Sequence, residues 1–147
     1  KSIMSRKIKI KRFDKNLPLP EYKTFGAAGF ELAARETTII KAGQIGIIPL
    51  NLSVATPKGY FMLLCARSST YKLGLTMING VGIVDSDFCG DNDECRFAVQ
   101  NFTKKFVTIE KGTRIAQGIF VKFIRSDWKE VDKMKSKDRG GFGSTGK

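Results

Sequence analysis

The chain has 147 residues, a length that suits one domain burying about 68–70% of its unfolded surface. Its 41% hydrophobic and 27% charged residues are ordinary for a globular protein, and no apolar run approaches the roughly 20 residues of a membrane helix. There is no histidine, which excludes His-based triads and His general bases, so acid–base chemistry near neutral pH falls to Asp or Glu. The three cysteines lack CxxC spacing and indicate free thiols in a reducing compartment rather than a zinc site.

Basic residues are in excess, and the net charge is +12. Lys1–Lys15 contain seven basic residues and one acidic residue, whereas Lys122–Arg139 contain seven basic and four acidic residues. This charge is compatible with nucleic acid, an anionic membrane surface or a polyphosphate ligand, and equally with a solvated surface that has no specific partner. The basic N-terminus has no apolar region behind it, so no secretion signal is expected.

Short β-rich runs separated by turn signals predict an all-β domain, either a sandwich, a jelly roll or a barrel. The first run, Lys7–Lys11, alternates with a period of two. The later runs are Thr37–Lys41, Gln44–Leu50, Tyr60–Cys65, Phe97–Val99, Phe106–Ile109 and Arg114–Ile124. No long amphipathic helix is predicted, although Ser126–Lys137 fits a short one.

The segment Asn79–Phe88 combines glycines, two aspartates and an aromatic ring. Glycine lets a backbone approach a ligand closely. In an extended strand Asp85 and Asp87 would share a face, whereas a turn at the aspartates would separate them. Such a segment can bind a flat base through its main chain and place a carboxylate beside the sugar and phosphate.

The last residues, Arg139–Lys147, are rich in glycine and cannot pack a core, which predicts a mobile tail. Gly141–Lys147 also fits the pattern G-x-x-x-x-G-K of a phosphate-binding loop. That interpretation is rejected, because such a loop needs a strand before it, a helix after it and Ser or Thr following the lysine.

Five motifs follow one another along the chain. They read Ala28-Gly29-Phe30-Glu31-Leu32, Ala66-Arg67-Ser68-Ser69, the segment Asn79–Phe88, Lys111-Gly112-Thr113-Arg114-Ile115-Ala116-Gln117, and the tail Arg139–Gly146. On these motifs the chain resembles the trimeric dUTPases, whose fold is similar to that of the dCTP deaminases. The resemblance implies an all-β, distorted jelly-roll or barrel-like sandwich over residues 1–138, and a flexible glycine-rich arm over residues 139–147 that closes over the active site.

The resemblance also implies an enzyme that hydrolyses dUTP to dUMP and pyrophosphate, lowering dUTP and supplying dUMP for dTMP synthesis. Asp85 matches the residue that holds the 3′-hydroxyl and orients or deprotonates the attacking water. Phe88 matches the ring that lies against the deoxyribose. Asn79, together with the backbone of Gly80, Gly82 and Val84, matches the part that binds uracil, on which Phe142 stacks. Each of these residues also has an ordinary structural role, as a turn former or a core aromatic.

Phosphate contacts are implied for residues of three motifs, namely Arg67, Ser68, Ser69, Gln117, Arg139, Ser144, Thr145 and Gly146. The implied cofactor is Mg²⁺, held mainly by the substrate phosphates and water, with Glu31 as a candidate outer contact. The implied assembly is a homotrimer with sites at subunit interfaces, in the cytoplasm or, in a eukaryotic or viral setting, the nucleus. No membrane partner is expected, and the basic N-terminus leaves open a nucleic-acid or protein partner.

The chain departs from the family pattern at four places. Glu31 stands where the family has Asp, and Ala66 where it usually has Pro. The tail is about two residues shorter than usual, and Asp91–Glu94 add about three residues, which suggests a longer surface loop or bulge. Two alternatives follow. One is a dCTP deaminase-like enzyme, for which Glu94 is the one candidate catalytic residue, and the other is a catalytically weakened nucleotide-binding regulatory relative.

Overall fold

The computed structural model describes residues 5–143. Within them the chain forms short strands and one 3-10 turn, η1 (Thr70–Leu73). The strands are β1 (Ile10–Arg12), β2 (Phe30–Ala33), β3 (Thr38–Ile40), β4 (Ile45–Pro49), β5 (Leu52–Val54), β6 (Tyr60–Ala66), β7 (Leu75–Met77), β8 (Gly82–Val84), β9 (Arg96–Asn101), β10 (Val107–Ile109) and β11 (Arg114–Lys122).

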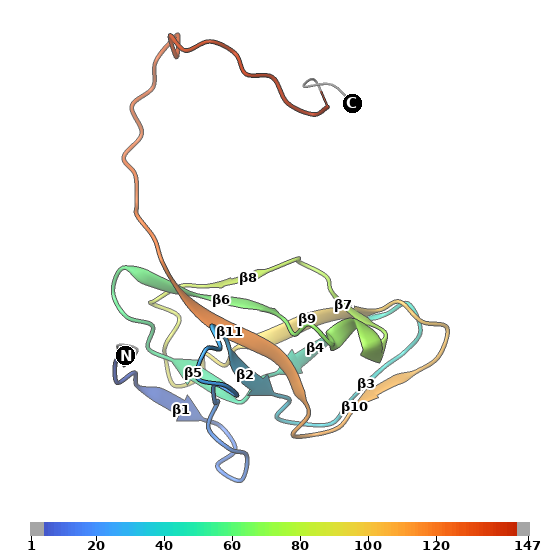
Figure 1. Ribbon diagram of the computed structural model, residues 1–147. Coiled ribbons are helices and arrows are strands. Elements are labelled where there is room, and N and C mark those ends of the chain that lie inside the picture. The colour runs from blue at the N-terminus through green and yellow to red at the C-terminus, as the bar shows by residue number, and fades with distance from the viewer. Residues whose placement is uncertain (1–4, 144–147) are drawn as a thin grey trace.

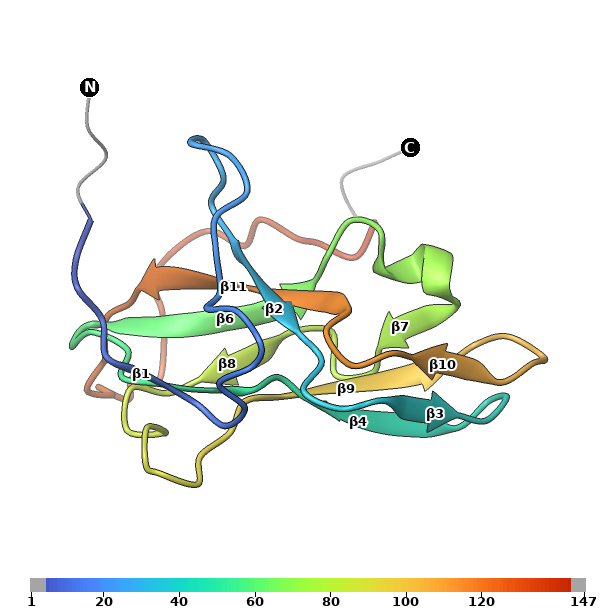
Figure 2. The same ribbon diagram turned by 90° about the horizontal axis from the view of Figure 1, so that it is seen from below.

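Two antiparallel sheets face each other and form a sandwich. One sheet has the order β2-β11-β6-β8 and the other the order β4-β9-β7, while β1-β5 and β10-β3 form two-stranded ribbons at the edges. Figure 1 shows that all the strands lie in one body, from which the C-terminal segment leads away. Figure 2 shows β11 and β6 in one layer and β4 and β9 in the other. The predicted all-β sandwich is therefore confirmed.

The core lies between the two sheets because alternate residues of the facing strands are apolar. Met62 and Leu64 on β6 meet Phe97 and Val99 on β9, and all four side chains are at most 3% exposed. Burial of each such side chain contributes about 1.5–3 kcal/mol relative to leaving it in water. The core therefore fixes the register in which the outward-facing residues are presented.

A bulge in β11 sets the direction of two residues of the fourth motif. The pairing of β11 with β2 shifts between Arg114 and Ala116, and both Ile115 and Ala116 are fully buried. A β-bulge lets two consecutive residues occupy one position of the ladder and re-aims the side chains around it. As a result Arg114 and Gln117 both lie outside the core.

The predicted short helix over Ser126–Lys137 is wrong, because this segment forms no helix. Its apolar residues Trp128, Val131 and Met134 are 93%, 50% and 82% exposed, so they have no surface to pack against. A short helix gains most of its stability from such packing. Figure 1 shows the chain leaving the body after β11.

Seven predicted runs correspond to strands, whereas β2, β5, β7 and β8 were not predicted. These four strands have three or four residues each, and β2 and β8 contain Glu, Ala or Gly, residue types depleted in strands. Within residues 5–143 no helix is long and apolar enough to cross a membrane.

Candidate active site

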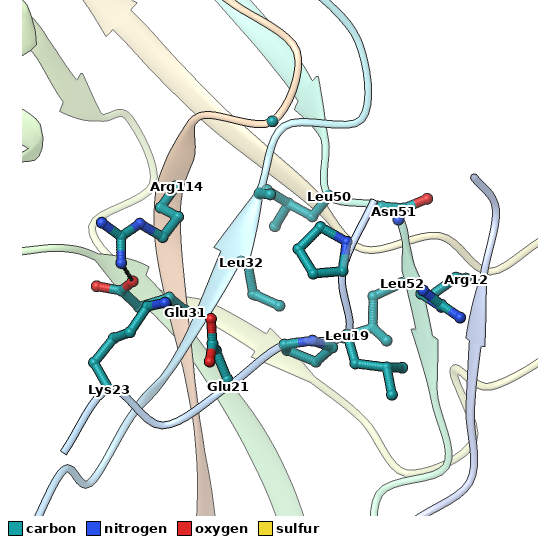
Figure 3. Close-up of a pocket in the computed structure, with 14 residues that line it drawn as sticks. Arg12, Leu19, Glu21, Lys23, Glu31, Leu32, Leu50, Asn51, Leu52 and Arg114 are labelled. Atoms are coloured by element: carbon teal, nitrogen blue, oxygen red, sulfur yellow. Dashed lines mark hydrogen bonds and ion pairs between the residues drawn. The ribbon is translucent and has the colours of Figure 1, made fainter. Parts of the chain in front are cut away.

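A carboxylate and two arginines from three different segments form an ion-pair cluster at the edge of the first sheet. Glu31 lies on β2, Arg114 lies on β11, and Arg67 directly follows β6. Oε1 of Glu31 lies 3.0 Å from Nε and 2.8 Å from Nη2 of Arg67, and Oε2 lies 2.7 Å from Nη1 of Arg114. Figure 3 shows Arg114 pointing at Glu31 beside a cavity of about 180 Å³.

The turn after β6 holds Arg67 in place. Its backbone N–H donates to Oγ1 of Thr70 at 2.9 Å, and the Thr70 hydroxyl in turn donates to the carbonyl of Ile115 at 3.1 Å. Ser68 is exposed and Ser69 is half-buried. Ser69 begins η1 without a side-chain capping bond, which leaves its hydroxyl available to a ligand.

Gln117 lies beside this turn on β11. Its Nε2 donates to the carbonyl of Ala66 at 3.0 Å, and the residue pairs with Glu31 on β2 and with Cys65 on β6. The glycine of the first motif makes room for it, since a Cβ on Gly29 would lie 2.6 Å from Oε1 of Gln117. The structure thus brings Glu31, Arg67 and Gln117 together, as well as Arg114, to which the sequence analysis assigned no role.

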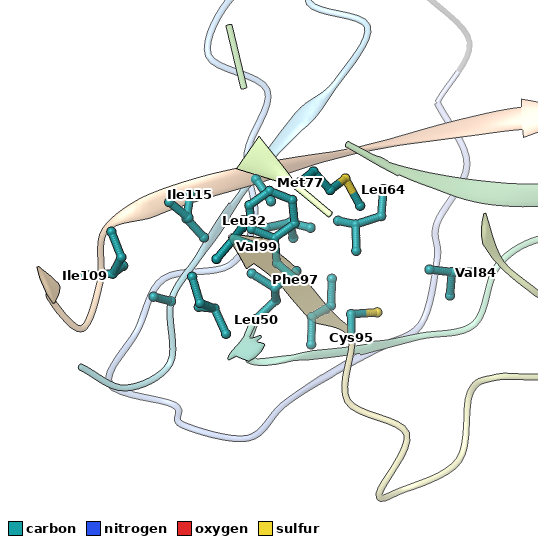
Figure 4. Packing of buried hydrophobic residues seen from close by; sticks show 14 of the residues in the cluster. Leu32, Leu50, Leu64, Met77, Val84, Cys95, Phe97, Val99, Ile109 and Ile115 are labelled. Carbon is teal, nitrogen blue, oxygen red and sulfur yellow. The ribbon is translucent and has the colours of Figure 1, made fainter. Parts of the chain in front are cut away.

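The segment Asn79–Phe88 borders a separate hollow of about 590 Å³. Asn79, Gly82–Asp85 and Phe88 line it. Gly80 has φ of 72°, a left-handed conformation that favours glycine, and the turn is closed by the Val81 N–H bonding the Asn79 carbonyl at 2.8 Å. Val84 and Cys95, two members of the buried apolar core, also line this hollow, and Figure 4 shows Val84 at the outer end of that core.

The two aspartates of this segment do not share a face. β8 ends at Val84, and the Phe88 N–H donates to the Asp85 carbonyl at 3.1 Å, which closes a turn over Asp85–Phe88. Asp85 is exposed and lines the hollow, whereas Asp87 is not among its lining residues. The structure therefore separates the two carboxylates and leaves Asp85 beside Phe88, whose side chain is 41% exposed.

The hollow and the arginine cluster lie toward opposite ends of β6 in one chain. β8 is antiparallel to β6, with Val84 opposite Met62 and Gly82 opposite Leu64. Asp85 therefore follows the Met62 end of the ladder, while Arg67 follows Ala66 at the other end. At about 3.3 Å per residue, this places the two residues about 20 Å apart along the strand.

Comparison with known proteins places the chain in a family. The family model for dUTPase matches residues 15–146. The chain belongs to the dUTPase family. Similar proteins include the deoxyuridine 5′-triphosphate nucleotidohydrolase of Dictyoglomus turgidum, 36% identical over 147 residues, 95% of this chain and 98% of that protein. The protein of the same name from Rickettsia bellii is 40% identical over 145 residues, 95% of each chain.

Solved dUTPase structures share the fold. The crystal structure of dUTPase from Streptococcus mutans has a TM-score of 0.75 and 34% identity, and the match covers 84% of this chain and all of that one. The dUTPase of Staphylococcus bacteriophage 80alpha with dUpNHpp has a TM-score of 0.85 at 23% identity over 97% of this chain and 99% of that one. The first confirms the expected jelly-roll-like sandwich, and the second supports the fold alone.

The last motif of the dUTPase pattern lies away from both groups of residues. Arg139 is exposed and Phe142 is fully exposed, and neither makes a side-chain hydrogen bond or ion pair within residues 5–143. Ser144, Thr145 and Gly146, which the resemblance assigns to phosphate binding, lie outside the described residues. A single chain therefore does not bring Phe142 to the hollow beside Asn79.

The buried carboxylate of Glu94 and the half-buried guanidinium of Arg35 form a pair that was not predicted from the sequence. Oε2 and Oε1 of Glu94 lie 2.7 and 3.0 Å from Nε and Nη2 of Arg35, and Oε2 also accepts the Asn51 N–H at 2.9 Å. Glu94 is 7% exposed, and its charge raises the pKa of the Arg35 guanidinium. Glu94 thus belongs to the folded body, whereas it was expected in a surface loop.

All three cysteines are free thiols, as predicted. Cys89 is exposed, Cys65 is half-buried and Cys95 is buried. Burial raises the pKa of the Cys65 thiol, and burial together with the charge of Glu94 raises the pKa of Cys95 to about 11. Neither thiol is therefore activated as a nucleophile at neutral pH.

Proposed function

We propose that the chain hydrolyses dUTP to dUMP and pyrophosphate, which lowers dUTP and supplies dUMP for dTMP synthesis. The observation that carries this proposal is the exposed carboxylate of Asp85 in a hollow that Asn79, the β8 backbone and Phe88 also line. Main-chain donors and acceptors can bind a flat base, and an aromatic face can lie against a sugar. The family membership of the chain supports the same reaction.

In the proposed reaction, the oxygen of a water attacks the α-phosphorus of dUTP. The bond from that phosphorus to the oxygen bridging the α- and β-phosphates breaks, and pyrophosphate leaves. Asp85 orients the water and takes its proton, because a carboxylate is the available base in a chain without histidine. The turn over Asp85–Phe88 holds this carboxylate beside the sugar-binding ring.

Discrimination among bases follows from the backbone between Gly80 and Val84. Donors and acceptors placed for O4 and N3–H of uracil oppose cytosine, in which the corresponding groups are reversed, and unpaired polar groups are strongly disfavoured in such a site. A close backbone also crowds the 5-methyl group of thymine. Phe88 excludes a 2′-hydroxyl by lying against the deoxyribose.

The phosphates are proposed to bind at the arginine cluster. Arg67 is pre-positioned by Glu31, and Ser68, Ser69 and Gln117 supply further polar groups around it. Donors held in place before the reaction stabilise the charge that develops on transferred phosphates. Arg114 adds a second positive charge at the same edge.

Mg²⁺ is the proposed cofactor, carried by the triphosphate. Within residues 5–143 no three Asp, Glu or Cys side chains gather around one point, and both oxygens of Glu31 hold arginines. This donor set fits a Mg²⁺ that takes most of its ligands from phosphates and water, a common arrangement for this ion. When bound, the ion would neutralise phosphate charge.

A homotrimer with sites between subunits is proposed as the active assembly. In one chain Asp85 and Arg67 lie toward opposite ends of β6, so a site that uses both needs a second copy. Ile45 and Ile47, two residues apart on β4, point to the same side of the strand and are 59% and 50% exposed, and Ile39 on β3 is 65% exposed. Exposed apolar side chains that share a face are candidate contacts of a subunit interface. The arm over residues 139–147 would then cover a site on another subunit.

The proposed reaction takes place in the cytoplasm, where free thiols such as those of this chain persist. The basic N-terminal segment offers a further surface for an anionic partner, although two of its residues are already engaged. Nζ of Lys11 donates to the Asp91 carbonyl and Nη1 of Arg12 donates to the Leu17 carbonyl, both at 2.7 Å.

Pyrophosphate release from dUTP, dCTP, dTTP and UTP, each with Mg²⁺, tests the proposed function. We expect rapid turnover of dUTP alone. Ammonia released from dCTP would instead indicate a deaminase, although Glu94, the candidate residue for that reaction, is engaged by Arg35 and Asn51. Binding of dUTP without turnover would indicate the regulatory relative.

A further inference from the structure

Two of the residues that the chain adds after Gly90 lie beside the candidate site. Asn92 and Asp93 line the same hollow as Asn79, Asp85 and Phe88. These two residues belong to the insertion relative to the dUTPase pattern, to which no role has been assigned. The wall of the hollow opposite the segment Asn79–Phe88 is therefore partly built from residues that the family pattern lacks.

Hydrogen bonds hold this loop in a single turn. The Gly90 N–H donates to Oδ2 of Asp93 at 2.7 Å, and the Asp93 N–H donates back to the Gly90 carbonyl at 3.1 Å. The same carbonyl accepts the hydroxyl of Ser53 on β5 at 2.8 Å. From β1, Nζ of Lys11 donates to the Asp91 carbonyl at 2.7 Å. Two neighbouring strands therefore fix the loop against the body.

The far end of the loop is anchored inside the protein. Glu94 is buried and makes the two-point pair with Arg35, and it also accepts the Asn51 N–H. Directly after it, the Cys95 N–H donates to the Leu52 carbonyl at 2.8 Å. A loop fixed at both ends loses little conformational entropy when a ligand binds beside it, so a contact from it adds to affinity.

We infer that the loop Gly90–Asp93 is a preformed wall of the nucleoside site and that Asn92 contacts the bound pyrimidine nucleoside. An Asn amide offers two donors and one acceptor, which suit the neutral carbonyl, imide and hydroxyl groups of a deoxyuridine. The candidate phosphate ligands follow the other end of β6, so this contact reaches the base and sugar and leaves the phosphates to Arg67. The inference rests on the proposed function and adds a residue that sets specificity.

Calorimetric titration of dUMP and 2′-deoxyuridine onto the full chain tests this inference. Neither ligand is hydrolysed, and both carry the nucleoside end. Since a lost neutral hydrogen bond weakens binding by a small factor, Asn92→Ala should raise the Kd of both ligands about three- to tenfold. The same variant should raise KM for dUTP by a similar factor and leave kcat unchanged, because the contact is made equally in the ground state and in the transition state.

Two further variants sharpen the test. Asn92→Trp places a bulky side chain at the same exposed position, and it should weaken dUMP binding further by filling the hollow. Asn16→Ala is the matched control. Asn16 is an exposed asparagine that lies outside the loop and does not line the hollow, so dUMP should bind this variant as it binds the wild type.

The outcomes separate the inference from the proposed function. If the wild type neither binds dUMP nor hydrolyses dUTP, the proposed function is wrong and the inference falls with it. If the wild type does both, and Asn92→Ala and Asn92→Trp bind dUMP as tightly as the wild type, the loop is not a wall of the site and only the inference is overturned. A fall in kcat with Kd unchanged for Asn92→Ala would also contradict it.

Discussion

Oε1 of Glu31 on β2 faces both Nε and Nη2 of Arg67, at 3.0 and 2.8 Å, while its second oxygen holds Arg114. Both carboxylate oxygens of Glu31 are thus engaged by arginines, and the carboxylate fixes the orientation of Arg67, a candidate contact of the substrate phosphates. The longer arm of Glu, compared with the Asp of the family pattern, spans the space between β2 and the turn after β6. We therefore expect the first motif of this chain to act through Arg67.

We predict that Glu31→Gln lowers kcat/KM for dUTP by roughly 10- to 100-fold, because charged hydrogen bonds of this kind contribute about 1.5–3 kcal/mol. Most of the effect should be in KM, since Arg67 would be less well ordered for binding. Steady-state kinetics checks this. Glu36→Gln is the control. Glu36 is exposed, and within residues 5–143 its one ion pair is a 3.8 Å contact with Arg35, so this variant should behave as the wild type.

Asp85→Asn should lower kcat by roughly 10²- to 10⁴-fold, the usual contribution of a positioned general base. Binding of dUTP should persist, because the amide can still hold the 3′-hydroxyl. Single-turnover hydrolysis and equilibrium binding measure the two effects separately. Asp87→Asn is the neighbouring control, since Asp87 does not line the hollow; if the two variants lose activity equally, Asp85 has no special role.

Removal of Gly140–Lys147 should lower dUTP turnover at least about tenfold, as expected when a closing segment is lost. The thermal midpoint should not change, because Gly140–Gly143 contribute no side chain to the core and Phe142 is fully exposed. Activity and thermal unfolding are measured on the same sample. Undiminished turnover would mean that the short tail does not close this site.

The raised pKa of the Cys95 thiol predicts a loss of stability at alkaline pH. Its pKa in the folded chain is raised from 9.0 to about 11, so the folded state holds the proton more tightly than the unfolded state does. The resulting stabilisation is complete below pH 9 and is lost as the pH rises from 9 toward about 11. Thermal melting at several pH values checks this, and a Cys95→Ala variant should show a flatter dependence over that range.

Much of the architecture follows from the sequence because its physical signals are local. The period-two run over Lys7–Lys11 and the apolar runs of β4, β6 and β11 predict strands whatever partner each strand has in the fold. The strands β2 and β8 were missed because they are short and contain Glu, Ala or Gly, residue types depleted in strands. The helix predicted over Ser126–Lys137 does not form, because its apolar face has nothing to cover it within one chain.

The site was predictable in part. The motifs point to Asp85 and Arg67, and the structure places the first in the hollow and the second in the arginine cluster. Two features were not predicted. One is Arg114, which a bulge turns outward, and the other is the anchoring of Glu94 by Arg35, a contact between residues 59 positions apart. Such contacts depend on the packed fold and leave no local signature in the sequence.

We propose that Asp85 and Arg67 serve one dUTP-hydrolysing site while belonging to different copies of the chain. Asp85→Asn and Arg67→Ala subunits, each inactive alone, can be unfolded, mixed in equal amounts and refolded together. Because each shared site draws its Asp85 and its Arg67 from separate subunits, about a quarter of the sites should regain both residues, and dUTP hydrolysis should return to about a quarter of the wild-type rate. A mixture that assembles but stays as inactive as the two single variants would contradict a site shared between copies of the chain.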